Sequence, residues 1–245
     1  MIRALHYHPK TGRCQRFDVI DEHYYRNTKG MYQSVNLYDG YDRKGPKIFC
    51  GEWASREGKP TTNMNAALGD AAWMTGMERN ADLLIGHCYA PLFVNVNPGG
   101  MQWESDLIGY DALKAYGSPS YYAQCMFASN VGNKIVPVEA KDIPQMDYQG
   151  SSLPQLYFSA TTSTTDGQTY LKIVNGGTTP QTITIHTIGG KPAKKGLLTV
   201  LHANKPDETN SINEPTHIVP QSSKVKTGSN FKLTVKPYSV NVIKM

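Results

Sequence analysis

Long apolar runs are missing from this 245-residue sequence. None approaches the ~18 residues that a membrane-spanning helix needs, so we predict that the chain is not an integral membrane protein. Charge is also sparse, because 18% of the residues are charged against ~25% in average proteins, whereas 39% are hydrophobic. That composition excludes a disordered or polyelectrolyte chain and indicates one that buries a core.

Arginine, tryptophan and cysteine are missing from the last third of the chain. All 7 arginines precede residue 140, and 15 of the 20 threonines follow it. Residues 1–140 hold 14 basic and 14 acidic side chains, and residues 141–245 hold 11 lysines against 6 acidic side chains, which accounts for the net charge of +5. These lysines are scattered without interleaved aromatics, so we expect them on a solvated surface and predict no nucleic-acid partner.

Patterns typical of metal and phosphate sites are missing as well. The spacings between the four cysteines are 36, 38 and 37 residues, which match no ligand pattern, so we predict buried thiols at Cys14, Cys50, Cys88 and Cys125. The segment 97–100 contains Pro and two Gly but lacks the Lys-Ser/Thr of a phosphate loop, and it is typical of a turn. No second histidine follows a His-Glu pair at helical spacing, and we predict no metal and no cofactor.

The change in composition divides the chain into two predicted domains, residues 1–137 and 138–245. Residues 138–150 are polar and contain a Pro and a Gly, as linkers do. In the first domain, strand and helix patterns alternate as in parallel βα units, with strands over 17–25, 46–52 and 82–90 and helices over 63–79 and 118–127. In the second, alternating polar and apolar residues predict an antiparallel sandwich with strands over 155–161, 169–175, 181–186, 196–201, 223–226, 230–235 and 239–245.

Both predicted helices begin at residues that commonly cap helices. Thr62 or Asn63 can accept hydrogen bonds from the first turn of the earlier helix. Ser118 can do so for the later one, where Pro119 occupies the first helical position.

Ionisable side chains gather where the first two predicted strands end. Glu52 ends a short apolar strand, and at the carboxyl end of a barrel strand such a carboxylate faces the active site. Glu52 could instead pair with Arg56 or Lys59. The run Asp21-Glu-His-Tyr-Tyr25 ends the preceding strand, and a histidine beside a glutamate can act as a base or an orienting group, or can simply cap the strand. Polar and aromatic side chains that would suit sugar hydroxyls and faces follow the third strand: Tyr89, Asn95, Asn97, Gln102 and Trp103.

Many short motifs in the chain resemble the α-L-arabinofuranosidases of glycoside hydrolase family 51, in order and spacing. They lie at residues 21–25, 38–43, 51–55, 65–76, 89–97, 103, 106–111, 117–122, 210–215 and 239–243. The resemblance implies the C-terminal part of a (β/α)8 TIM barrel, about strands 6–8, followed by an antiparallel β-sandwich. It implies a retaining enzyme that removes terminal non-reducing α-L-arabinofuranosyl residues from arabinan or arabinoxylan, chemistry that needs two carboxylates and no cofactor.

The resemblance also assigns roles to particular residues. Glu52 takes the place of the nucleophile, and His23 and Tyr25 would hold both Glu52 and the sugar. Tyr89 and Asn95 would contact the sugar. The family's acid/base glutamate follows an asparagine on the fourth strand and has no counterpart here, since Asn213-Glu214 lies in the sandwich and Glu22 on another strand. The first domain supplies three strands of eight, so we expect a fragment that is nearly inactive in isolation.

Three other functions stay open at this stage: an inactive fragment, a non-catalytic carbohydrate-binding protein, or a related barrel glycosidase. The expected partner is an arabinose-containing polysaccharide or oligosaccharide, with no membrane partner. A sheet of three parallel strands has unpaired edges, so a homo-oligomer that forms through the barrel is a further alternative. A secreted parent enzyme would fit this substrate, although the first ten residues lack the apolar core of a signal peptide, and the sequence does not fix the compartment.

Overall fold

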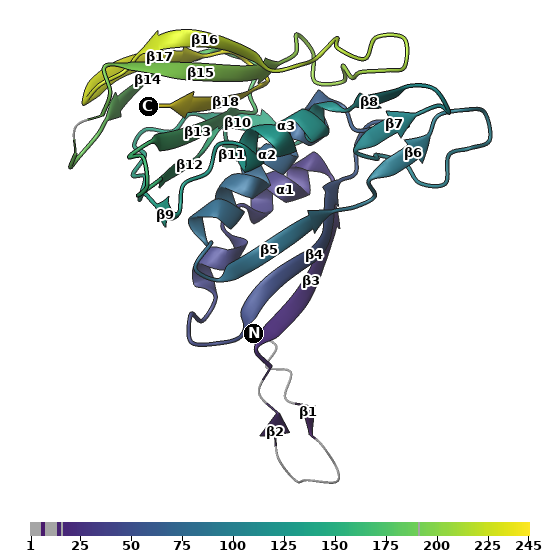
Figure 1. Cartoon of the computed structure of the whole chain (residues 1–245), viewed down its shortest axis with the longest axis horizontal. Helices are drawn as coiled ribbons and strands as arrows, with labels where there is room; N and C mark the ends of the chain where they lie inside the picture. The colour runs from purple at the N-terminus through teal and green to yellow at the C-terminus, as the bar shows by residue number, and fades with distance from the viewer. Residues whose placement is uncertain (1–5, 8–13, 16, 191) are drawn as a thin grey trace.

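A computed structural model describes residues 6–7, 14–15, 17–190 and 192–245, and places a layer of helices between two sheets (Figure 1). The lower sheet has the parallel order β3-β4-β5. Its strands and the helices between them alternate along the chain as β3 (Val19–Arg26), α1 (Thr28–Ser34), η1 (Leu37–Gly40), β4 (Lys47–Ser55), α2 (Met64–Arg79) and β5 (Leu84–Tyr89). Parallel strands require such crossovers, so the predicted βα units are confirmed.

Two short helices lie outside the sequence predictions. The 7-residue α1 is capped by Asn27, whose side chain accepts a hydrogen bond from Gly30 N. Both α1 and the 4-residue η1 are too short to show helical periodicity in the sequence. By contrast, α2 and α3 (Pro119–Ala128) begin where predicted, capped by Asn63 and Ser118.

A smaller sheet follows β5. It has the order β6-β7-β8, with strands at Phe93–Asn95, Ile108–Tyr110 and Ala115–Gly117, and it lies at the right of Figure 1. Near the start of the chain, β1 (His6–Tyr7) pairs with β2 (Cys14–Gln15).

The second half of the chain forms the predicted antiparallel sandwich. A six-stranded sheet has the order β16-β15-β18-β13-β12-β9, and β14 pairs with β17. Apolar residues of both sheets, Ile173 and Ile243 on one side and Phe231 and Leu233 on the other, share one buried cluster, so the sheets face each other. The strands of these two sheets are β9 (Lys134–Ile135), β12 (Leu156–Thr162), β13 (Thr169–Asn175), β14 (Gln181–His186), β15 (Lys195–His202), β16 (Gln221–Lys226), β17 (Asn230–Val235) and β18 (Ser239–Lys244). Between β9 and β12, β10 (Gln145–Tyr148) and β11 (Ser151–Pro154) pair with each other as a separate hairpin.

Helix α2 is buried on all sides, because both halves of the chain pack against it. Of its 16 residues 13 are buried, which explains why its sequence shows only a rough apolar stripe. Trp73 of α2 and Val240 of β18 belong to the same core cluster, so the outer face of the sandwich covers the helices that also cover the parallel sheet. Strand β9 joins the sandwich sheet although it precedes residue 138, and the division of the chain at that residue stays a prediction.

A buried ion pair crosses this junction. Lys172 of β13 is fully buried and pairs with Glu78 of α2, which also accepts a hydrogen bond from Ser159. Lys172 Nζ lies 4.6 Å from the Phe127 ring centroid and donates to the Phe127 carbonyl at 3.3 Å. The expectation that the lysines of this half lie on a solvated surface is therefore wrong for Lys172, whose partner lies 94 residues away in the sequence.

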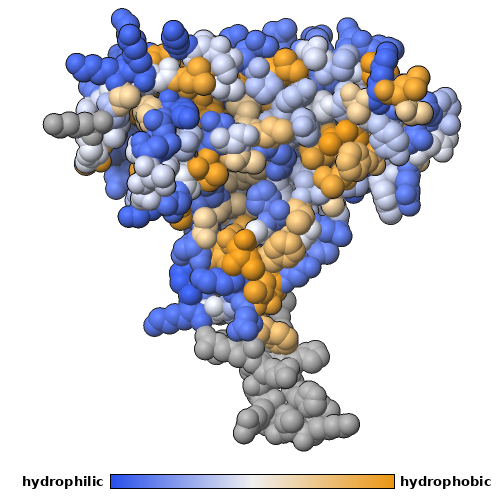
Figure 2. Space-filling view, in the orientation of Figure 1, coloured by the Kyte–Doolittle hydropathy of each residue, from blue (hydrophilic) through white to orange (hydrophobic). Residues whose placement is uncertain are grey.

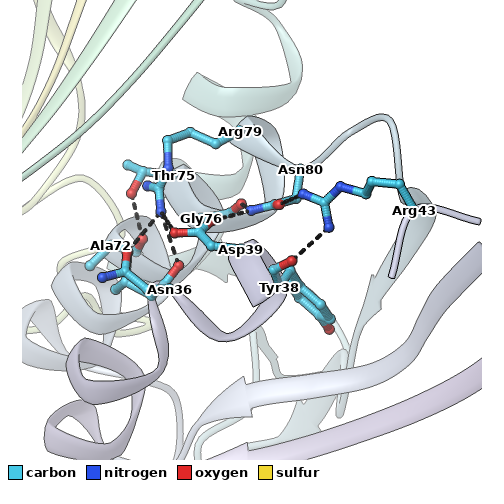
Figure 3. Close-up of polar contacts among 10 residues, drawn as sticks. Asn36, Tyr38, Asp39, Arg43, Ala72, Thr75, Gly76, Arg79 and Asn80 are labelled. Atoms are coloured by element: carbon cyan, nitrogen blue, oxygen red, sulfur yellow. Dashed lines mark hydrogen bonds and ion pairs between the residues drawn. The ribbon is translucent and has the colours of Figure 1, made fainter. Parts of the chain in front are cut away.

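Polar contacts also fix the C-terminal end of α2, as Figure 3 shows. Asn80 donates to Asp39 Oδ1 at 2.7 Å and to the Gly76 carbonyl at 2.8 Å, and it accepts a hydrogen bond from Arg43. Arg79 reaches Asp39 Oδ2 at 3.3 Å. These contacts tie α2 to η1 and to the loop before β4.

The cysteines differ in burial. Cys50 on β4 is buried as predicted, whereas Cys88 on β5 is exposed and Cys125 is half-buried. The prediction fails for Cys88 because β5 is the edge strand of its sheet, where only one neighbour covers the chain. The Cys14 side chain lies outside the described residues.

Candidate active site

The two faces of β3 have different surroundings. Asp21, His23 and Tyr25 are exposed on one face, and the residues between them are half-buried on the other. On the half-buried face, Tyr24 packs edge-on to Trp73 of α2 with ring centroids 5.6 Å apart. Glu22 shares that face and accepts hydrogen bonds from Tyr24 at 2.8 Å and from Tyr41 at 3.0 Å. The Glu22 carboxylate therefore lies on the face of the sheet that the helices cover. This position agrees with the expectation that Glu22 is not the general acid.

A bulge in β4 decides where the Glu52 side chain points. Asp21 and His23 are two residues apart on β3 and pair with Phe49 and Glu52, which are three apart on β4. The pairing with β5 shows the same extra residue in β4, between Cys50 and Trp53. Strict alternation from buried Cys50 would turn Glu52 toward the helices. The bulge instead leaves Glu52 on the exposed face, a common role of bulges near active sites.

The Glu52 carboxylate meets two of the predicted residues there. Tyr25 donates a 2.6 Å hydrogen bond to Glu52 Oε2, and His23 Nδ1 lies 3.6 Å from the same oxygen. Partial burial, together with the Glu52 carboxylate, raises the pKa of Tyr25 to about 12, so the hydroxyl keeps its proton at neutral pH. Within the described part of the chain Glu52 Oε1 accepts no hydrogen bond. One carboxylate oxygen is thus held while the other faces solvent.

Asp21 adds a second carboxylate to this group. Its Oδ2 lies 3.0 Å from His23 Nε2, and its Oδ1 accepts a 2.9 Å hydrogen bond from Gly51 N. No role follows for Asp21 or Gly51 from the sequence motifs alone, although one signal is present. Asp21, His23 and Tyr25 alternate along a strand and therefore share one face.

The other two predicted sugar contacts do not join this group. Tyr89 is buried, with 7% of its surface exposed, and its hydroxyl donates to Asp70 Oδ2 on α2 at 3.3 Å. Asn95 lies on β6 in the smaller sheet, and its Oδ1 accepts a 3.0 Å hydrogen bond from Asn97 N. Their proposed contacts with sugar stay predictions.

Asp70 is the centre of a separate buried polar cluster. Besides Tyr89, its carboxylate accepts hydrogen bonds from the Ser120 hydroxyl at 2.6 Å and from Ser55 N at 2.9 Å. Burial raises the pKa of Asp70 to about 7, although these hydrogen bonds act in the opposite direction. The cluster joins β4, β5, α2 and α3.

Exposed apolar side chains lie over the parallel sheet and near β6 and β7, and others lie on the sandwich (Figure 2). Ile85 of β5 and Phe93 of β6 are 59% and 62% exposed. Among the described residues no group of three or more His, Cys, Asp or Glu could hold a metal ion. The described helices include none that is both long and apolar enough to cross a membrane.

Comparison with known proteins places most of the chain in one family. A family model described as the α-L-arabinofuranosidase C-terminal domain matches residues 48–239. An extracellular exo-α-L-arabinofuranosidase from Streptomyces chartreusis is 39% identical over 137 residues, which cover 56% of this chain and 16% of that protein. α-L-arabinofuranosidase 1 of Arabidopsis thaliana is 31% identical over 230 residues, 90% of this chain and 32% of that protein. The chain thus spans a third or less of the length of these relatives.

Solved structures agree with this match. An arabinose-bound GH51 α-L-arabinofuranosidase is 32% identical and superposes with a TM-score of 0.83, over 93% of this chain and 36% of that one. An arabinofuranosidase from Thermotoga maritima has a TM-score of 0.74 at 17% identity, which shows the shared fold. The parallel strands and the sandwich correspond to the C-terminal part of this barrel-and-sandwich architecture.

Proposed function

The chain belongs to the family of α-L-arabinofuranosidase C-terminal domains, and from that premise we propose that it carries the nucleophile of a retaining α-L-arabinofuranosidase. The observation that carries the proposal is the position of Glu52, at a bulge near the carboxyl end of a parallel strand, with Oε2 held by Tyr25 and facing His23. In barrel enzymes this end of the strands holds the reacting groups.

The proposed chemistry uses the free oxygen of Glu52. Oε1 attacks the anomeric carbon and forms a glycosyl ester while the glycosidic C–O bond breaks and the leaving oxygen takes the electron pair. Tyr25 donates to Oε2 and so holds the carboxylate in one orientation. Water then hydrolyses the ester, and the sugar leaves with its original configuration.

Retention also requires a second carboxylate about 5–5.5 Å from the first, acting as acid and then as base. We assign this role to none of the described residues. Asp21 already binds His23 and Gly51, and Glu22 lies on the opposite face of the sheet. A substrate whose leaving group is stable as an anion bypasses the acid, so it reports on the nucleophile alone.

The proposed substrate class is an arabinose-containing polysaccharide or oligosaccharide. Support comes from the relatives, which are named α-L-arabinofuranosidases, and from the related structure with bound arabinose. We further propose that residues 1–137 form the catalytic part and residues 138–245 the sandwich domain.

The test is the intact mass of the full chain after incubation with an aryl α-L-arabinofuranoside that bears a good leaving group. Although we expect the isolated chain to be nearly inactive on natural substrates, this substrate does not need the missing acid, and we expect a gain of one pentosyl unit that peptide mapping places on Glu52. Glu52→Gln should abolish the gain, and Glu22→Gln, a matched carboxylate on the opposite face, should keep it. An unlabelled wild-type chain, or a label that persists in Glu52→Gln, would contradict the proposal.

A further inference from the structure

Asp21 links the two strands that carry the proposed nucleophile site. Its two oxygens bind different partners, Gly51 N at 2.9 Å and His23 Nε2 at 3.0 Å. One partner directly precedes Glu52, and the other is the imidazole that faces Glu52. The Asp21 side chain is 56% exposed, so burial does not account for the arrangement.

The contact with Gly51 belongs to the bulge in β4. The extra residue of a bulge is left unpaired by the ladder, and here the Asp21 carboxylate accepts from Gly51 N. A Cβ built on Gly51 would overlap that carboxylate. The missing side chain of Gly51 therefore leaves room for the Asp21 carboxylate. The hydrogen bond between the two residues fixes the backbone directly before Glu52.

The contact with His23 decides which ring nitrogen carries the proton. An ionised carboxylate only accepts hydrogen bonds, so Nε2 must be the donor. A neutral imidazole then has its lone pair on Nδ1, the atom 3.6 Å from Glu52 Oε2. In that tautomer His23 does not donate to the nucleophile, and the Glu52 charge stays available for attack.

We propose that Asp21 is a positioning residue, which clamps the Gly51 bulge and holds neutral His23 in the Nε2–H tautomer. Its effect on rate rests on the proposed role of Glu52, whereas its effect on His23 does not. Asp21 binds Gly51 and His23 rather than the reacting oxygen of Glu52, and it acts through the two residues that it binds. This role differs from that of Tyr25, which contacts Glu52 directly.

Asp21→Asn tests the proposal with little change in shape. The amide oxygen can still accept from Gly51 N, but the amide NH2 must donate to Nε2 and so moves the imidazole proton to Nδ1. We expect ¹⁵N NMR at about pH 8.5 to show a protonated Nε2 in the wild-type chain and a protonated Nδ1 in the variant. His23→Gln identifies the resonances. Asp18→Asn, an exposed aspartate just before β3, should leave them unchanged.

The second readout is kinetic. We expect the rate constant for formation of the pentosyl-enzyme from the aryl arabinofuranoside to fall about 10–100-fold in Asp21→Asn, with an unchanged half-saturating concentration. Asp18→Asn should react at the wild-type rate. A purely structural role would instead lower the folded fraction, which thermal unfolding monitors.

The two readouts separate the proposals. If the wild-type chain takes up no pentosyl group, the role of Glu52 fails, and the NMR spectra still decide whether Asp21 sets the tautomer. A wild-type His23 protonated at Nδ1, or an Asp21→Asn spectrum identical to the wild type, would overturn the proposal for Asp21. A labelled wild type with an equally fast Asp21→Asn would do the same.

Discussion

Tyr25 and Glu52 are 27 residues apart in the sequence, and a 2.6 Å hydrogen bond joins them across neighbouring parallel strands. The bond exists because the bulge in β4 turns Glu52 onto the face that β3 presents with Asp21, His23 and Tyr25. It holds one carboxylate oxygen and leaves the other to solvent.

Tyr25→Phe removes that hydrogen bond and little else, because the ring is 42% exposed. We expect about tenfold slower pentosyl-enzyme formation, since a hydrogen bond to a charged group is lost, with thermal stability close to wild type. The raised pKa of Tyr25, about 12, means that the wild-type rate shows no loss from tyrosine ionisation below about pH 10. A stopped-flow pH series on both chains checks this, and an equal rate in Tyr25→Phe would contradict it.

Asp70 predicts a pH dependence of folding stability. Its pKa rises from 3.8 to about 7 on burial, so the folded chain binds this proton more tightly than the unfolded chain does. The contribution is fully present below about pH 3.8 and is lost as the pH rises through about 7, at no more than about 1.4 kcal/mol per pH unit. Asp70→Asn mimics the neutral acid and should flatten this slope in urea unfolding at pH 5, 6, 7 and 8.

The matched control for Asp70 is Asp207→Asn, which changes an exposed carboxylate. It should keep the wild-type slope. Equal slopes for Asp70→Asn and the wild-type chain would show that Asp70 does not titrate in this range.

Lys172→Met leaves Glu78 buried without its partner. Removing one member of a buried pair typically costs ~3–5 kcal/mol, so we expect a loss of this size in urea unfolding. The double variant Lys172→Met/Glu78→Leu should recover most of it, because neither charge is then buried. Lys244→Met, which removes a lysine 5.8 Å from the Tyr170 ring, should cost less than about 1 kcal/mol. A double variant as unstable as the single one would exclude the ion pair as the cause.

Gly76→Ala tests the close approach of α1 and α2. A Cβ at Gly76 would overlap the carbonyl of Val35, directly after α1, so we expect a loss of about 1–3 kcal/mol despite the better helix propensity of alanine. Gly40→Ala is the control, since nothing lies within 4 Å of its added Cβ. Similar unfolding midpoints for Gly76→Ala and Gly40→Ala would contradict the expected overlap.

Features that depend on neighbouring residues in the sequence could be predicted. Asn63 and Ser118 cap their helices through bonds to Ala66 N and Tyr121 N, three residues ahead. The parallel strands β3, β4 and β5 and the sandwich strands β12 to β18 follow from patterns of polar and apolar residues, whereas the short strands β6 to β11 do not. The motifs also single out Glu52, His23 and Tyr25, which lie together in the structure, and the roles assigned to them stay predictions.

Features that depend on distant partners could not be predicted. Tyr89 is buried because α2 and α3 supply Asp70 and Ser120 around it, 19 and 31 residues away. Lys172 is buried because Glu78 lies opposite. The bulge that turns Glu52 outward is defined by how β4 pairs with β3 and with β5. The pattern of polar and apolar residues along β4 does not indicate it.

The burial of α2 from both sides has a consequence for how such proteins can be rearranged. The parallel sheet covers one side of α2 and the sandwich covers the other. The buried Lys172 belongs to the sandwich. Expressing the first half alone would expose the apolar surface of a central helix to water, and a foreign sandwich would have to match both that surface and Glu78. Recombination between relatives should therefore succeed only when helix and sandwich are inherited together.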